Sequence, residues 1–263
     1  MKKVKPAITA IPDIQNQVDS RKITIDKVGV KGVCYPIIVS DRSNQIQHTI
    51  ADINFYVELP HYNRGTHMSR FLEVLNAYHE EDLINNLENL LAAIKKSLKA
   101  DAAYIEIKFP YFIQKKAPVS KIASYLNYEC YFKAALTDTY EFWIGAKVPV
   151  TTLCPCSKEI SLKGAHNQRS EVTAFIQYED FVWLEEIIDL IENSCSCDIY
   201  PLLKRVDEKY VTEKAYNNPM FVEDIIRELT TKLQSDQRIV HYEIEAENFE
   251  SIHNHNAYAY KKQ

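Results

Sequence analysis

Glycine is scarce in this chain of 263 residues, which contains five glycines and ten prolines. No three of the glycines form a G-x-G-x-x-G pattern, and the G-x-x-x-x-G-K-[ST] pattern is absent. Both patterns place backbone N–H groups around phosphates. Glycine-rich phosphate loops are therefore excluded, and any nucleotide must be held by side chains and other backbone groups. The low glycine and proline content also excludes collagen-like and low-complexity chains.

Long apolar runs are missing as well, since no stretch approaches the 18 residues that a membrane-spanning helix needs. The first 17 residues include lysines but lack the apolar core of a secretory signal. We therefore predict a cytoplasmic protein that binds no membrane, with its six cysteines present as thiols. The net charge of −5 argues against a nucleic-acid-binding surface, which is normally basic, but permits a local basic pocket for a small anion.

Apolar residues make up 46% of the chain, which is enough for a core that needs no disulfide or metal to fold. Alternation of apolar and polar residues predicts strands at 22–33, 49–59, 102–113, 125–136, 140–150, 170–180, 239–249 and 255–262. Apolar residues at helical spacing predict helices at 82–99 and 181–193. Another helix is predicted to begin at Asn218, the N-cap, with Pro219 in its first position.

The order strand–strand–helices–strand–strand therefore occurs twice, with a division near residues 137–139. Hairpin-connected strands with helices grouped between them predict an α+β fold with mostly antiparallel sheets. We predict a flexible N-terminal arm over 1–20, a first module over 21–137 and a second over 138–263, each with its own four-stranded sheet.

The loop at 151–169 combines two thiols, an imidazole and several cations between two predicted strands. A thiolate at Cys154 and an imidazole at His166 suit zinc or a similar divalent metal, and three protein ligands would leave one position open for water. The competing interpretation is that Cys154 and Cys156 are small buried residues and that His166 is an ordinary surface residue. Spacing alone leaves both open.

The segment at 194–224 is rich in charge, and its composition by itself favours a solvated amphipathic helix. Glu223 differs from its neighbours because it lies between the apolar Val222 and Ile225, close to the expected helix start. One interpretation is a favourable interaction with the helix dipole. The functional alternative is a carboxylate that accepts the paired N–H donors on the edge of a guanine or pterin.

Two further segments carry histidines. The segment at 60–71 contains Arg64 and His67 ahead of a possible helix, and it is either a phosphate site or a helix start with surface charges. The segment at 247–260 contains His253 and His255, at spacing that places them on one face of an extended chain. Each is suited to a structural hydrogen bond or to general acid–base catalysis.

Together these segments resemble one family, the type IB GTP cyclohydrolases. The resemblance lies in VELPHYNRGTHMSRF, VPVTTLCPCSKEIS with GAHNQRS, YPLLKRVDEKYVTEKAYNNPMFVED and ENFESIHNHNA, and it extends over about residues 25–260. It implies tandem tunnelling-fold (T-fold) modules, each an antiparallel sheet that carries two helices. It also implies conversion of GTP to 7,8-dihydroneopterin triphosphate and formate, the first step of folate and pterin synthesis.

The resemblance further assigns residues to roles. It implies a divalent metal (Zn, Mn or Fe) held by Cys154, His166 and Glu208, with Cys154 as the essential cysteine. Glu223 matches the glutamate that anchors the purine, and His253 matches a site histidine. We add the nearby cations Arg64, His67, Lys204 and Arg205 as predicted substrate-binding residues. A homotetramer with active sites at subunit interfaces is the implied assembly.

Two alternatives differ in chemistry. A nitrile reductase of the same fold would use the cysteine as a nucleophile with NADPH and no metal, but the GAHNQR histidine and the lack of a dinucleotide-binding pattern disfavour it. The other is a non-enzymatic binding protein with a structural zinc on Cys154, Cys156, Cys195 and Cys197. Cys-x-Cys spacing is unusual for structural zinc. The sequence does not distinguish the favoured function from a variant of it that releases a cyclic phosphate.

Overall fold

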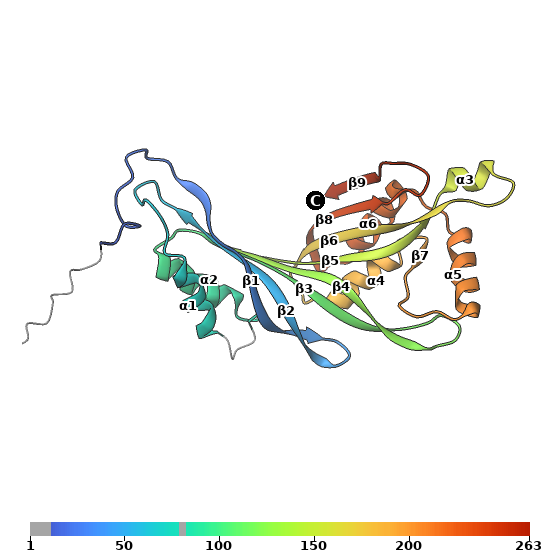
Figure 1. Cartoon of the computed structure of the whole chain (residues 1–263), viewed down its shortest axis with the longest axis horizontal. Coiled ribbons are helices and arrows are strands. Elements are labelled where there is room, and N and C mark those ends of the chain that lie inside the picture. The colour runs from blue at the N-terminus through green and yellow to red at the C-terminus, as the bar shows by residue number, and fades with distance from the viewer. Residues whose placement is uncertain (1–11, 79–82) are drawn as a thin grey trace, which may run out of the picture. The chain divides into compact units, whose positions relative to one another are not determined.

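The computed structural model describes residues 12–78 and 83–263. Figure 1 labels its helices and strands. The strands are β1 (Ile25–Asp41), β2 (Gln45–Leu59), β3 (Ala103–Lys116), β4 (Ala123–Leu136), β5 (Tyr140–Leu153), β6 (Asn167–Tyr178), β7 (Cys197–Asp198), β8 (Ile239–Asn248) and β9 (Ala257–Lys262). The helices are α1 (Ser69–Ala77), α2 (Leu87–Leu98), α3 (Pro155–Ile160), α4 (Leu184–Glu192), α5 (Arg205–Asn217) and α6 (Val222–Ser235).

The strands form one hydrogen-bonded sheet in the order β1-β2-β3-β4-β5-β6-β8-β9, with the short β7 paired to β5. Pairing from β5 through β6 and β8 to β9 is antiparallel. The predicted α+β class with antiparallel strands is therefore confirmed. The prediction of two separate four-stranded sheets is wrong, because residues 137–139 form a turn, closed by the N–H of Thr137 on the carbonyl of Thr139 (3.1 Å), that leads from β4 into its neighbour β5.

The chain divides into two compact units. The first comprises residues 1–32, 54–105 and 135–140, and the second comprises 33–53, 106–134 and 141–263. The order β-β-α-α-β-β occurs in β1–β4 with α1 and α2. It occurs again in β5–β9, where α3, β7 and α5 are additional. The predicted module boundary at 137/138 stays a prediction.

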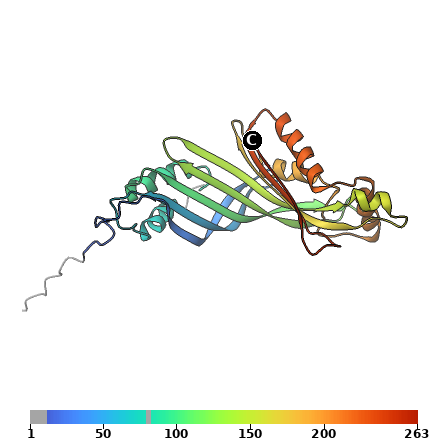
Figure 2. The same ribbon diagram turned by 90° about the horizontal axis from the view of Figure 1, so that it is seen from above.

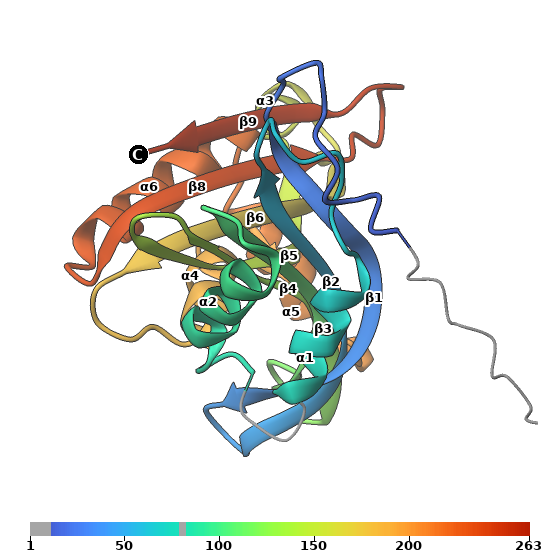
Figure 3. The same cartoon turned by 90° about the vertical axis from the view of Figure 1, so that its left-hand side faces the viewer.

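In the first unit α1 packs against α2 (Figure 3). Phe71 and Leu75 of α1 are fully buried, as are Leu90 and Leu91 of α2. Both helices therefore present an apolar stripe to the interior and polar residues to solvent, as helical spacing of apolar residues requires.

In the second unit α4 and α6 cover the strands. α6 packs along β8 and β9 (Figure 2), and α4 contacts β6 and α6. Ile187 and Ile191 on α4 and Ile225 and Leu229 on α6 are at most 1% exposed. Their burial against the strand residues that alternate inward makes the core of this unit.

Several predicted boundaries are wrong. Asn218 does not begin a helix but ends α5, where its side-chain amide donates to the carbonyl of Cys195 (2.9 Å). α6 starts at Val222, because the carboxylate of Asp224 accepts the N–H of the N-cap residue Phe221 (3.0 Å). That arrangement resembles a capping box, in which a side chain at the third helical position satisfies the backbone before the helix.

The first strand and the first long helix also differ from prediction. β1 continues to Asp41, whose carboxylate accepts the N–H groups of Ser43 (2.8 Å) and Asn44 (2.7 Å) and so stabilises the turn into β2. The helix predicted over 82–99 is formed as α2 from Leu87, after turns at 83–86, and residue 82 lies outside the described residues. It ends at Lys99, which has the left-handed backbone conformation (φ 53°).

Residues 12–20 belong to the predicted N-terminal arm, and residues 1–11 of that arm lie outside the described part of the chain. The carbonyls of Gln15 and Gln17 accept the N–H groups of Gly65 (3.1 Å) and Arg64 (2.9 Å). This part of the arm is thus attached to the loop before α1. In the described chain no helix has both the length and the apolar character required to cross a membrane.

Candidate functional site

Cys154 and His166 lie next to each other where β5 ends and β6 begins. The backbone N–H of Cys154 donates to the carbonyl of His166 (3.1 Å). Cys154 is the N-cap of α3, and its Sγ accepts the N–H of Ser157 (3.4 Å). The hydroxyl of Ser157 accepts the N–H of His166 (3.2 Å). The backbones of the predicted cysteine and histidine are therefore adjacent, because the short helix folds the connection back on itself.

The His166 ring is 16% exposed and has polar neighbours. Its Nδ1 is 3.1 Å from Oε1 of Gln168. The same nitrogen is 4.0 Å from a carboxylate oxygen of Glu250, which follows β8. Glu250 is positioned by its neighbour Phe249, whose N–H donates to the carbonyl of Arg169 (3.0 Å).

Glu223 lies in the first turn of α6, and its side chain is exposed in the single chain. The helix start is attached to the end of β5, because the N–H of Met220 donates to the carbonyl of Leu153 (3.0 Å). Leu153 immediately precedes Cys154. Glu223 is thus placed on a segment anchored beside the thiol and available to a ligand.

Glu208, Lys204 and Arg205 lie at the start of α5, and all three are exposed. The helix approaches the thiol loop with its other end, where Nζ of Lys158 on α3 donates to the carbonyl of Tyr216 (2.5 Å). At 1.5 Å per residue, Glu208 is about 12 Å along the helix axis from Tyr216. This spacing explains why the predicted third ligand is not gathered with the other two.

Asp207, next to Glu208, is fully buried and has a structural role. Its carboxylate accepts the N–H groups of Val119 and Ser120 (2.8 Å each), the Ser120 hydroxyl (2.6 Å) and the N–H of Lys204 (2.9 Å). Burial alone would raise the pKa of Asp207, but these hydrogen bonds hold it well below its usual range. The contacts attach α5 to the loop between β3 and β4.

The cysteines do not form a zinc site of their own. Cys195 and Cys197 are buried, whereas Cys156 is exposed. Burial raises the pKa of Cys197 to about 11. Within residues 12–78 and 83–263, no three His, Cys, Asp or Glu side chains form a group that could hold a metal. The four-cysteine alternative is therefore wrong, and the set of Cys154, His166 and Glu208 is not preformed in one chain.

A hollow of about 470 Å³ lies beside the start of β6. Its lining includes Gln168, Arg169, Tyr200 and Thr212, so it lies between the strand that follows His166 and the inner side of α5. Its size falls within the range of small-molecule sites.

The other predicted phosphate-binding residues belong to the first unit. The guanidinium of Arg64 donates to the side-chain oxygen of Gln17 (3.2 Å), and Nε2 of His67 is 3.2 Å from a carboxylate oxygen of Asp13. His67 and Arg70 line a polar hollow of about 250 Å³ beside the loop before α1. Arg70 and Lys99 in its lining are suited to an anion.

His253 lies in the exposed connection between β8 and β9, and its ring stacks on His255 with 5.1 Å between the ring centres. The predicted common face of the two histidines is therefore confirmed. Glu250, three residues before His253, has a carboxylate oxygen 4.0 Å from the His166 ring.

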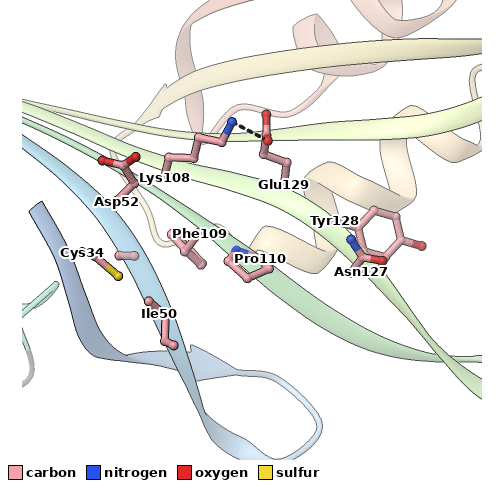
Figure 4. Close-up of a pocket in the computed structure, with 10 residues that line it drawn as sticks. Cys34, Ile50, Asp52, Lys108, Phe109, Pro110, Asn127, Tyr128 and Glu129 are labelled. Carbon is pink, nitrogen blue, oxygen red and sulfur yellow. Dashed lines mark ion pairs between the residues drawn. The ribbon is translucent and has the colours of Figure 1, made fainter. Parts of the chain in front are cut away.

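A separate hollow of about 320 Å³ lies over β2, β3 and β4 in the second unit (Figure 4). Lys108 and Glu129 face each other there at 2.5 Å, and Cys34 lies near Ile50. None of the predicted site residues lines it.

Sequence reasoning missed the buried polar side chains beneath His166. Gln168, Thr152, Ser170 and Asn248 are at most 7% exposed, although they occupy inward positions where the strands otherwise place apolar residues. The sequence did offer a signal, namely a polar residue at a strand position whose side chain points inward. Such a residue needs a hydrogen-bond partner when it is buried.

Comparison with solved structures shows the fold. A uricase from Bacillus fastidious superposes with a TM-score of 0.54 at 10% identity, covering 93% of this chain and 94% of that one. A urate oxidase from Bacillus sp. TB-90 gives a TM-score of 0.51 at 10% identity, covering 91% and 98%.

Comparison with curated proteins shows much nearer relatives, each named GTP cyclohydrolase FolE2. That of Geotalea uraniireducens is 55% identical over 94% of this chain and 91% of its own length. That of Geobacter sulfurreducens is 54% identical over 95% and 96%. The family described as type I GTP cyclohydrolase FolE2 matches residues 11–259. This chain therefore belongs to the type I GTP cyclohydrolase FolE2 family.

Proposed function

We propose that this chain is a metal-dependent GTP cyclohydrolase of type IB that converts GTP and water to 7,8-dihydroneopterin triphosphate and formate, the first step of folate and pterin biosynthesis. The observation that carries the proposal is the placement of Cys154 and His166 on one loop, with Glu223 anchored beside them. Family membership supports the same activity. The repeated element order and the likeness in fold to urate oxidases support tandem T-fold modules.

Cys154 and His166 are chemically suited to hold Zn²⁺, Mn²⁺ or Fe²⁺ together, because a thiolate and an imidazole are both good ligands for such ions. We propose Glu208 as the third ligand. A divalent metal held there supplies Lewis acidity and a water activated at neutral pH.

The chain's own residues supply recognition and proton transfer. The Glu223 carboxylate accepts two N–H donors from the guanine edge and orients the base. Carbon 8 of the guanine base becomes electrophilic once the five-membered ring of the base is protonated. His253 is the proposed proton donor. Water adds at carbon 8, the ring opens to a formamide, and a second water releases formate. Rearrangement of the ribose and closure of the new ring, with loss of one water, then give the pterin. Arg64, His67, Lys204 and Arg205 are the proposed contacts to the triphosphate.

Base recognition provides the test of the function. The chain with Mn²⁺ or Zn²⁺ should release formate from GTP and yield a pterin that fluoresces after oxidation, whereas ATP should not react, since its edge offers Glu223 the wrong donors. Glu223→Ala should lower kcat/KM for GTP at least about 100-fold, because buried donors of the base lose their charged acceptor.

The control is Glu228→Ala on the same helix, whose exposed carboxylate lies near Lys232 (3.3 Å) and which should keep wild-type turnover. Comparable turnover of GTP and ATP would refute the role of Glu223. If no formate is released from GTP with Mn²⁺, with Zn²⁺ or with Fe²⁺, the proposed function is refuted.

We further propose a homotetramer in which each active site is completed by a neighbouring chain. The support is that Glu223 and residues 159–163, between Cys154 and His166, are exposed in one chain and that Arg64 and His67 belong to a different compact unit. The sheet ends in β1 and β9, and proteins usually pair or cover such edges. Closed symmetry would make all sites equivalent.

Complementation tests the shared site. Cys154→Ala and Arg64→Ala chains, each nearly inactive, should regain activity when they are mixed under conditions of subunit exchange. Up to about a quarter of the sites would then have both residues intact. A mixture that exchanges subunits, as shown by mass, but stays inactive would show that each site is built from one chain.

A further inference from the structure

Four buried polar side chains continue from His166 into the second unit. Oε1 of Gln168 is 3.1 Å from Nδ1 of His166, and Nε2 of Gln168 donates to the hydroxyl of Thr152 (3.0 Å). The Thr152 and Ser170 hydroxyls are 2.8 Å apart, and the Ser170 hydroxyl donates to Oδ1 of Asn248 (2.7 Å). The series crosses the neighbouring strands β5, β6 and β8.

The acceptor at the far end sets the direction of every hydrogen bond. Ser170 gives its proton to the Asn248 carbonyl, so it accepts the proton of Thr152. Thr152 then accepts from the amide nitrogen of Gln168, and this leaves the amide oxygen facing His166. A carbonyl oxygen is only an acceptor, so Nδ1 of His166 must carry the proton.

Burial makes this arrangement rigid. Thr152 and Ser170 are 0% exposed, Asn248 is 2% exposed and Gln168 is 7% exposed. Reversing the Gln168 amide would turn its oxygen toward the Thr152 hydroxyl, whose only proton is given to Ser170, so two acceptors would face each other. An unsatisfied buried polar group costs about 1–3 kcal/mol, so the amide keeps one orientation.

We propose that Gln168 is a positioning residue that holds His166 as the tautomer with the proton on Nδ1 and the lone pair on Nε2, the form required of a metal ligand at Nε2. Histidine ligands generally donate their other ring N–H to a fixed acceptor, which orients the ring. Glu250 lies near the same nitrogen at 4.0 Å, beyond hydrogen-bonding distance, so the amide is the direct acceptor. The inference rests on the proposed function, since it takes His166 as a ligand.

The test measures affinity for Zn²⁺ alone, by competition with a chromophoric chelator, on the full chain. Gln168→Leu removes the acceptor and should raise the Zn²⁺ Kd about 10–100-fold. Gln168→Glu keeps an oxygen acceptor for the ring but loses the N–H that Thr152 accepts, so it should raise the Zn²⁺ Kd by about 3–10-fold, less than Gln168→Leu does. Equal loss of affinity in both variants would show that side-chain shape matters rather than the acceptor, and unchanged affinity in Gln168→Leu would also overturn the proposal.

A second pair of variants preserves side-chain shape. Thr152→Val removes the partner that orients the Gln168 amide, and it should weaken Zn²⁺ binding by less than Gln168→Leu but measurably, about 3–10-fold. Thr230→Val is the matched control, because the buried Thr230 hydroxyl on α6 has no hydrogen-bond partner among the described residues. It should leave the Zn²⁺ Kd unchanged. Equal Zn²⁺ Kd values for the two valine variants would refute the proposal that Thr152 orients the Gln168 amide.

The outcomes separate this inference from the proposed function. A wild-type chain that binds Zn²⁺ but releases no formate from GTP would refute the function, while the Kd values would still decide the role of Gln168. A wild-type chain that binds none of the three metals would refute both. Apo-protein unfolding, followed in urea, shows whether a variant lost stability instead, which by itself would not move the Kd of the folded protein.

Discussion

Replacement of Cys154 by alanine is expected to lower GTP turnover at least about 1000-fold, the largest effect on activity that we predict. A loss of about 4 kcal/mol of transition-state stabilisation corresponds to that factor, and activation of water by a metal is worth several kcal/mol. The protein should still fold, because Cys154 is only half-buried and the core of the second unit lies elsewhere.

The experiment compares Cys154→Ala with Cys156→Ala, two residues away and exposed. Formate release, bound metal per chain and circular dichroism are measured on both. Cys156→Ala should keep most of the activity and the metal, whereas Cys154→Ala should lose both. Removal of metal from wild type by a chelator should abolish turnover, and Mn²⁺, Zn²⁺ or Fe²⁺ should restore it. Full activity in metal-stripped protein would refute metal dependence.

Replacement of Lys115 by methionine is expected to lower the free energy of unfolding by about 3–5 kcal/mol, the largest effect on stability that we predict. Nζ of Lys115 donates to Glu192 (2.8 Å), to Asp198 (3.0 Å) and to the carbonyl of Ile199 (2.8 Å). These charged side chains are only 10–12% exposed. Methionine fills the space but leaves two buried carboxylates without their shared cation.

The pH dependence of this loss has a definite sign. Burial alone would raise the pKa of Asp198, but Lys115 and the hydrogen bonds from Lys214 and Tyr200 lower it to about 2. The stabilisation from Asp198 is therefore present above its ordinary pKa near 4 and is lost as the pH falls toward 2. In Lys115→Met the carboxylates take up protons more readily, so the deficit relative to wild type should shrink between pH 7 and pH 5.

Equilibrium unfolding in urea at fixed protein concentration measures both effects. Lys108→Met is the control, because Lys108 is 53% exposed beside Glu129 and should cost at most about 1 kcal/mol. A Lys115→Met deficit no larger than that of the control, or one that grows as the pH falls, would contradict the role given to the buried ion cluster.

Local patterns determined much of the secondary structure. Period-two alternation located each long strand, because one face of every strand is buried. The same patterns could not show that β4 and β5 are neighbours in one sheet, since strand pairing depends on a turn of three residues and not on the strands' own composition. Helix ends were misplaced where a side chain such as Asp224 satisfied the backbone.

The motifs indicated Cys154, His166 and Glu223 as one site, and the structure places the loop and the helix start that carry them at the end of β5. The neighbouring Asp207 and Glu208 show the limit of this reasoning. Successive helix residues point about 100° apart. One of these two carboxylates is therefore buried against the β3–β4 loop while the other faces solvent, and only packing decided which.

By itself, the sequence determined the fold class, the long strands, the helices α2, α4 and α6 and the residue types of the site, because these follow from local periodicity and from short motifs. The tertiary structure decided which side chains hydrogen bond to one another. Gln168, Thr152, Ser170 and Asn248 are separated by up to 96 positions, yet they hydrogen bond in series because β5, β6 and β8 are adjacent. Hydrogen bonds between side chains depend on their distance in space and on their burial, and the spacing of residues along the chain determines neither.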